Sequence, residues 1–192
     1  MFFSKESILL IKNWDTLEDI QRSYTNLESE LSNLLQSIKY ELEKRTWWNS
    51  NWIYQIYKPD QNYITRKEWQ IGTFDFLWIG IESYGVKNVF GEESVPRMYV
   101  WINNDKGGFA KKIVEEIQRD KKKVLGELDI RAGNGYIAHT AAQKCLPDQL
   151  ESYPDTFKQQ MLDFYDFWVK RLEPFELIIQ EYLKKQKKEN KK

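Results

Sequence analysis

The chain has 192 residues, enough for one domain with a substantial core, and its 41% hydrophobic and 30% charged residues exclude an intrinsically disordered protein. The formal net charge is zero, but residues 184–192 hold six lysines and one glutamate, or +5, which leaves −5 on the rest. A mildly acidic body is a poor match for a protein dedicated to duplex DNA, which needs a strongly basic face. We therefore expect a single domain over residues 1–183 and a lysine-rich tail over residues 184–192.

The number of cysteines and the lengths of the apolar segments indicate the cellular compartment of the protein. Cys145 is the single cysteine, so an intrachain disulfide is excluded and a reducing compartment is favoured. The short apolar run near the N-terminus has no basic leader ahead of it and no small-residue cleavage site after it. No apolar segment approaches the roughly 18–20 residues that cross a bilayer. These features predict a cytoplasmic protein without a membrane partner.

A long amphipathic helix is the strongest periodic signal, and we expect it over about residues 15–45. Asp15 and Glu18 have the spacing of a capping box at its start. A wide stripe favours a helix that lies across a sheet in a globular core, whereas the seven-residue repeat also permits a coiled-coil dimer. The apolar stripe advances in steps of three and four residues: Leu17, Ile20, Tyr24, Leu27, Leu31, Leu34 and Ile38, widened by Leu35 and Leu42.

Aromatic and β-branched runs predict the strands. Asp60–Lys67 is polar and is expected to be a connection, while Gly72 and Gly80 mark expected bulges or kinks in the long aromatic run around them. Both faces of Phe74–Ile81 are largely apolar, which predicts a central strand covered on both sides. The predicted strands are Trp52–Tyr57, Trp69–Ser83 (one long bent strand or two), Arg97–Asn103, Glu127–Arg131 and Tyr136–Ala141, the last two around a Gly133-Asn134-Gly135 turn.

Two further helices complete the pattern. The first contains the apolar residues from Phe109 to Leu125 and ends at Gly126. The second opens at Pro154 and is kinked or restarted by Pro174. The predicted class is therefore α+β: an antiparallel or mixed sheet of about five strands, flanked by a long N-terminal helix, a middle helix and a kinked C-terminal helix.

The order helix, three strands, helix, strand is that of PD-(D/E)XK restriction-type nucleases. In such a site carboxylates hold Mg²⁺ or Mn²⁺, and a lysine helps to activate water. Asp75 and Glu82 are suitable first carboxylates, and Glu127 and Asp129 alternate on a later predicted strand. The strand that should supply the D/E-x-K triplet instead reads Met98-Tyr99-Val100-Trp101-Ile102, without carboxylate or lysine. A divergent metal-dependent nuclease is therefore an alternative interpretation and not the leading one.

Aromatic rings near arginines form the more informative set. Trp47, Trp48 and Tyr57 adjoin polar turn residues, and Arg66 and Arg97 border the predicted strands. Exposed rings beside arginine can stack unpaired bases or anchor a protein partner, although the same rings can also be core. These five residues are the binding candidates. We predict no catalytic residue, and with one histidine and one cysteine we predict no metal site.

Four segments share residue types with a known module: RMYVWIN, FAKKIVEEIQRD, GELDIR and DFYDFWVKRLEPF. On these segments, residues 97–182 resemble an uncharacterised α+β module often attached to restriction-type nucleases in bacteria and archaea. The resemblance implies an α+β fold and a prokaryotic or phage defence context, and it transfers no catalytic residue. We therefore expect a non-enzymatic binding or interaction module that works with nucleic-acid-processing or defence proteins and needs no cofactor. The alternatives are a nuclease that uses Mg²⁺ or Mn²⁺, and a structural protein that dimerises through its N-terminal helix.

Overall fold

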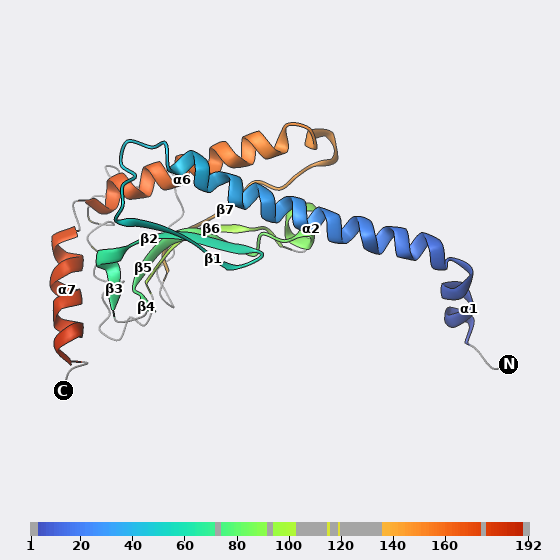
Figure 1. Cartoon of the computed structure of the whole chain (residues 1–192), viewed down its shortest axis with the longest axis horizontal. Coiled ribbons are helices and arrows are strands. Elements are labelled where there is room, and N and C mark those ends of the chain that lie inside the picture. Colours follow the sequence, from blue (N-terminus) through green and yellow to red (C-terminus); the bar gives the residue numbers. More distant parts are fainter. Residues whose placement is uncertain are drawn as a thin grey trace.

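The computed structural model describes residues 4–71, 74–91, 94–102, 115, 119, 136–173 and 176–189 (Figure 1). The predicted α+β class and the long N-terminal helix are confirmed. Within the described part of the chain, no helix is both long and apolar enough to cross a membrane. The elements are α1 (Lys5–Lys12), α2 (Trp14–Leu42), β1 (Trp52–Lys58), β2 (Gln61–Arg66), η1 (Lys67–Trp69), β3 (Gln70–Ile71), β4 (Phe74–Asp75), β5 (Leu77–Glu82), α3 (Val86–Phe90), β6 (Arg97–Ile102), β7 (Tyr136–Ala141), η2 (Pro147–Gln149), α6 (Tyr153–Leu172) and α7 (Glu176–Glu189).

In the described part of the chain, the main sheet contains five antiparallel strands in the order β1-β2-β5-β6-β7. Strand β2 corrects the predicted polar connection over Asp60–Lys67. Its polar residues Asn62 and Thr65 are fully buried, and the Thr65 hydroxyl donates to the Leu77 carbonyl at 2.7 Å. Because buried polar groups are stable in a strand when they are hydrogen-bonded, a central strand can carry a polar sequence.

The segment Trp69–Ser83, predicted as one long bent strand or two, is divided into more elements than that. Its first residue closes the 3₁₀ turn η1, and β3 and β4 pair only with each other, as a small second ladder. The Phe76 amide then donates to the Trp69 carbonyl at 2.9 Å, and β5 alone enters the main sheet. Residues of β5 are buried on both faces of the sheet, as the apolar pattern of the sequence predicts.

Gly80 permits a close approach of strands and is not the bulge that the sequence predicts. It pairs in regular register with Tyr63 of β2 and Tyr99 of β6. A Cβ atom at this position would lie 2.2 Å from the Asn62 carbonyl oxygen and 2.6 Å from the Tyr63 Cβ. Any side chain would therefore push β2 away from β5.

Helices α2 and α6 run side by side across one face of the sheet (Figure 1). Beneath them Ile64, Ile79 and Val100 are neighbours on β2, β5 and β6 and are fully buried. The predicted interruption of the last helix is confirmed, because α6 ends at Leu172 and α7 begins at Glu176.

A buried polar network fixes the helices on this face. The Tyr54 hydroxyl donates to the Leu35 carbonyl of α2 at 2.5 Å and accepts from the Asn62 amide. The Tyr165 hydroxyl of α6 donates to the Asn62 side-chain oxygen at 3.4 Å. Burial raises the pKa of both phenols above the ordinary value of tyrosine. The network thus joins β1, β2, α2 and α6.

Helix α2 has two different halves. In the C-terminal half, Leu31, Leu35, Ile38 and Leu42 are buried in the core. The N-terminal half projects beyond the sheet and carries α1 at its far end (Figure 1). The predicted capping box is wrong: the helix begins at Trp14 after Asn13, so Asp15 lies inside its first turn.

Several predicted elements fall outside the described residues. These are most of the middle helix from Phe109 to Leu125, the strand Glu127–Arg131 and the Gly133-Asn134-Gly135 turn. Glu115 and Arg119, the described residues of the middle helix, are helical.

Candidate functional site

A pocket of about 800 Å³ lies where three parts of the chain meet: the segment after α2, the open end of the β1–β2 hairpin, and the junction of α6 with α7. This volume is within the range of small-molecule binding sites. Three kinds of side chain line it: the rings of Trp47, Trp52 and Trp69, the cations Lys44, Arg45, Arg66 and Lys170, and the carboxylates Asp166, Glu173 and Glu176.

The rings belong to a chain of tryptophans in mutual contact. Trp47 packs edge-on against Trp52 at a centroid distance of 5.2 Å, and Trp52 packs edge-on against Trp69 at 5.5 Å. Trp48 lies behind them, 5.8 Å from Trp47 and 6.3 Å from Trp52. Trp52 and Trp69 are buried, whereas Trp47 and Trp48 are half-buried. The pocket therefore has a rigid aromatic wall with Trp47 at its more accessible end.

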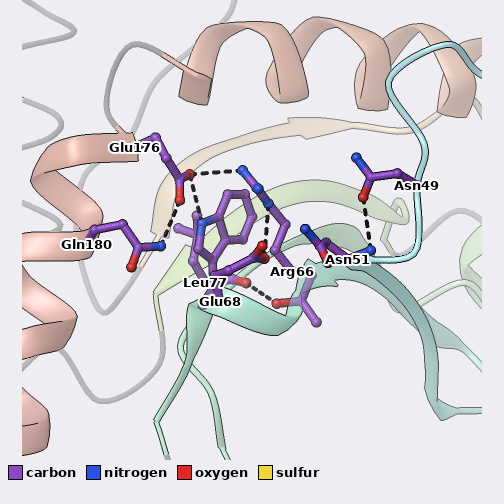
Figure 2. A network of polar contacts seen from close by, with 9 residues as sticks. Asn49, Asn51, Arg66, Glu68, Leu77, Glu176 and Gln180 are labelled. Carbon is purple, nitrogen blue, oxygen red and sulfur yellow. Dashed lines mark hydrogen bonds and ion pairs between the residues drawn. The ribbon is translucent and has the colours of Figure 1, made fainter.

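Arg66 lies against this wall, at the end of β2. Its guanidinium carbon is 5.7 Å from the ring centroids of both Trp52 and Trp69, within cation–π distance. Its Nη1 is 3.3 Å from Glu176 of α7, and its Nε is 3.4 Å from Glu68 (Figure 2). The arginine is thus held by two rings and two carboxylates.

Glu176 is the centre of this group. Figure 2 shows it between Arg66 on the sheet side and Gln180 on α7. The Trp69 indole donates to the glutamate at 3.0 Å, and the Gln180 amide donates to it at 2.8 Å. These contacts tie α7 to the sheet.

Asp166 on α6 repeats the arrangement at the other side of the pocket. The Trp47 indole donates to it at 2.7 Å, and the Arg45 guanidinium is 3.4 Å away. Each carboxylate therefore receives one indole and one guanidinium. Such charge-assisted contacts set the orientation of the rings.

The charges of the pocket almost cancel. Four cations face three carboxylates, and both arginines are neutralised by carboxylates within the site. Lys44 is paired with Glu41, outside the pocket lining, at 2.8 Å, and Lys170 has no ion pair within the described part of the chain. The pocket can therefore receive a flat ring against tryptophan and one or two negative charges at its lysines, but it does not offer the basic field that a polyanion requires.

The structure brings together some of the predicted binding residues. Trp47 and Arg66 line the pocket, and Trp48 packs behind its wall. Tyr57 lies near the opposite end of β1, with its side chain exposed. Arg97 is on β6, 2.9 Å from its strand neighbour Glu82, and does not line the pocket.

The predicted nuclease carboxylates are divided between described and undescribed residues. Asp75 accepts hydrogen bonds from the Tyr63 hydroxyl at 2.7 Å and from the Gln70 amide at 2.8 Å, and Glu82 is paired with Arg97. Glu127 and Asp129 fall outside the described residues. Among the residues described, no group of three His, Cys, Asp or Glu side chains is placed to hold a metal ion.

Asp166 and Glu176 are among the site residues that the sequence analysis missed, as are Trp52, Trp69, Arg45 and Lys170. The two carboxylates lie 119 and 107 positions from the tryptophans that they bind. On their helices they are ordinary acidic residues in an amphipathic pattern, so no local signal marks them. Comparisons with protein-family models, with curated proteins and with solved structures found no match for this chain.

Proposed function

We propose that the protein is a non-enzymatic binding module, and that its pocket takes a flat aromatic ring that carries an anionic group, as an unpaired nucleotide does. The observation that carries the proposal is the wall of Trp47, Trp52 and Trp69 beside an 800 Å³ pocket with Lys44 and Lys170 among its lining residues. Stacking of one base on an aromatic side chain contributes about 1–3 kcal/mol.

The electrostatics favour a short ligand over a duplex. Arg45 and Arg66 are already paired with Asp166 and Glu176, and Lys44 is paired with Glu41 at 2.8 Å. Lys170 therefore remains for phosphate, together with Lys44 if the ligand displaces its partner Glu41. Neutralising one or two phosphates of a single strand gives a slope of only about −0.7 to −1.4 in log affinity against log salt. The proposal includes a cytoplasmic setting, which the single, buried Cys145 fits, and work beside nucleic-acid-processing proteins in prokaryotic or phage defence.

The test is a titration of the full chain with mononucleotides, single-stranded pentamers of DNA and RNA, and a duplex of the same sequence. Binding is measured by calorimetry and by quenching of tryptophan fluorescence. We expect single-stranded ligands to bind with the shallow salt dependence given above and the duplex to bind more weakly. The proposal is overturned if none of the single-stranded ligands binds.

Variants locate the site. Trp47→Ala should weaken binding about 5- to 150-fold, because the accessible end of the wall is lost. Trp47→Phe keeps a ring but loses the bond to Asp166, so it should bind better than Trp47→Ala if stacking matters. Tyr57→Ala is the control, since it removes an exposed ring of the β1–β2 hairpin outside the pocket. Equal effects of Trp47→Ala and Tyr57→Ala would contradict the assignment.

A further inference from the structure

The N-terminal half of α2 exposes an apolar face that the rest of the described chain does not cover. Trp14, Leu17, Ile20 and Tyr24 are 58%, 40%, 59% and 39% exposed. Large exposed apolar patches mark interaction sites on soluble proteins. The residues from Trp14 to Glu30, about 25 Å of helix, form the segment that we call the arm.

The arm has the sequence pattern of a coiled-coil seam. With Leu17 and Tyr24 at the a positions of a heptad, Ile20 and Leu27 fall at the d positions. The charged residues of the first turns lie on the outer b, c and f positions: Asp15, Glu18, Asp19 and Arg22. The seam itself is therefore apolar.

The flanks of the seam are also informative. Thr16, Gln21 and Ser23 occupy the e and g positions beside its first three apolar residues and carry no charge. A partner selected by charge would instead find complementary groups at these positions. Neutral flanks permit an identical helix to approach without repulsion at the contact.

We propose that the arm binds the arm of a second copy of this chain, in antiparallel orientation. When Leu17 packs against Leu27 of the other copy, Ile20 packs against Tyr24 of the other copy. Because the pair is symmetric, each of these two contacts occurs twice, and all four seam residues are covered in both copies. Glu28 and Glu30 then lie beside Trp14 and Thr16 of the other copy, so no acidic flanks face each other. This inference is independent of the pocket.

The shape of the molecule supports the antiparallel orientation. The arm projects away from the sheet, and burial in the core begins at Leu31 (Figure 1). An antiparallel pair places the two bodies at opposite ends of the seam, whereas a parallel pair brings them to the same end. The exposed Leu9, Leu10 and Ile11 of α1 would then lie near the body of the other copy.

The first test is light scattering after size exclusion at about 50 µM. We expect a mass near 46 kDa, twice the 23.2 kDa of the chain. Ile20→Glu should raise the dissociation constant by roughly 100-fold or more, because it places two charges in an apolar seam. Thr25→Glu adds the same charge at an exposed outer position and should leave the dimer intact. A monomer for the unaltered chain, or equal effects of the two variants, overturns the proposal.

Salt separates self-association from the capture of a basic partner. The arm carries five acidic residues and one arginine, or −4. Screening should therefore leave the dimer unchanged or strengthen it between 50 and 500 mM salt. Dissociation of the dimer over this range contradicts self-association through an apolar seam.

Orientation is tested with spin labels on a Cys145→Ala background. In an antiparallel pair, labels on Thr16→Cys are separated by about 18 Å along the axis and those on Glu30→Cys by about 24 Å, whereas a mixed dimer brings them side by side. A parallel pair gives the opposite pattern. The two labels then lie side by side in each single variant, and in the mixed dimer they are separated by about 21 Å along the axis. Circular dichroism of each variant confirms that the helix is retained. The parallel pattern overturns the orientation proposed.

Discussion

The two halves of helix α2 carry the same apolar repeat but meet different surroundings. Leu35 and Ile38 are 2% and 0% exposed, whereas Leu17 and Ile20 are 40% and 59% exposed. The repeat sets which face of the helix is apolar, and the rest of the chain sets what that face meets. Both sequence-based alternatives, a helix across a sheet and a coiled-coil dimer, therefore apply to the same helix: the first is confirmed for its C-terminal half, and the second is proposed for the arm.

The largest difference between the halves should appear in core truncation. Ile38→Ala leaves a cavity between α2 and the sheet, and we expect it to lower the free energy of unfolding by about 2–5 kcal/mol. Ile20→Ala is the matched control in the arm and should change it by less than about 0.5 kcal/mol when the protein is dilute enough to be monomeric. Urea unfolding followed by circular dichroism measures both. Equal costs would show that the arm is also covered in the monomer.

Alkaline pH should weaken the core and spare the arm. Burial raises the pKa of Tyr153 on α6 to about 12, compared with about 10 in an unfolded chain. Because the unfolded state ionises first, stability is complete below pH 10 and falls between pH 10 and 12, by about 2–3 kcal/mol for this residue. Tyr54 and Tyr165 add to the loss, since burial raises the pKa of each. Urea midpoints at pH 8, 10 and 11 measure the loss, and Tyr153→Phe should flatten the dependence. An unchanged slope in that variant contradicts the assignment.

The hydrogen bond that fixes the buried half should have a smaller effect. Tyr54→Phe removes the hydroxyl between the Leu35 carbonyl and the Asn62 amide, and leaves that buried amide without this acceptor. We expect a loss of about 1–2 kcal/mol in the free energy of unfolding. Tyr57→Phe, on the same strand but exposed, is the control and should have no measurable effect. The same loss in both variants would show that the network contributes nothing specific.

Exposed ion pairs on the polar face of α2 should contribute equally little to stability in its two halves. Lys39 and Glu43 in the buried half, and Arg22 and Asp19 in the arm, form exposed ion pairs at 3.7 Å. Lys39→Gln and Arg22→Gln should each change the free energy of unfolding by less than about 0.5 kcal/mol. A larger effect of Lys39→Gln would indicate that the buried half is stabilised from its outer face as well.

The features of the fold that the sequence predicts are those with a regular apolar period. The repeat of α2, the strands β1 and β6 and the interruption between α6 and α7 all follow from local patterns. Strand β2 could not be predicted in this way, because the bonds that make Asn62 and Thr65 acceptable in the core come from other elements. The division of the long aromatic run also depends on the turn at Trp69, which carries no turn-forming glycine or proline.

The site could be predicted only in part for the same reason. Trp47 and Arg66 are residue types that mark binding surfaces, and the structure places both at the pocket. Their partners Asp166 and Glu176 come from helices more than a hundred positions away, so only the tertiary fold brings them together. Arg97, by contrast, is paired across the strands with Glu82.

Because Gly80 has no side chain, it limits which amino-acid substitutions this protein can tolerate. Every replacement of glycine adds a Cβ atom, and here that atom would meet the backbone of β2. The displaced strand carries Asn62, the residue that joins α2 and α6 to the sheet. In a library of all single substitutions, position 80 should therefore tolerate no other amino acid, while the outer positions of the arm, such as Thr25, accept most.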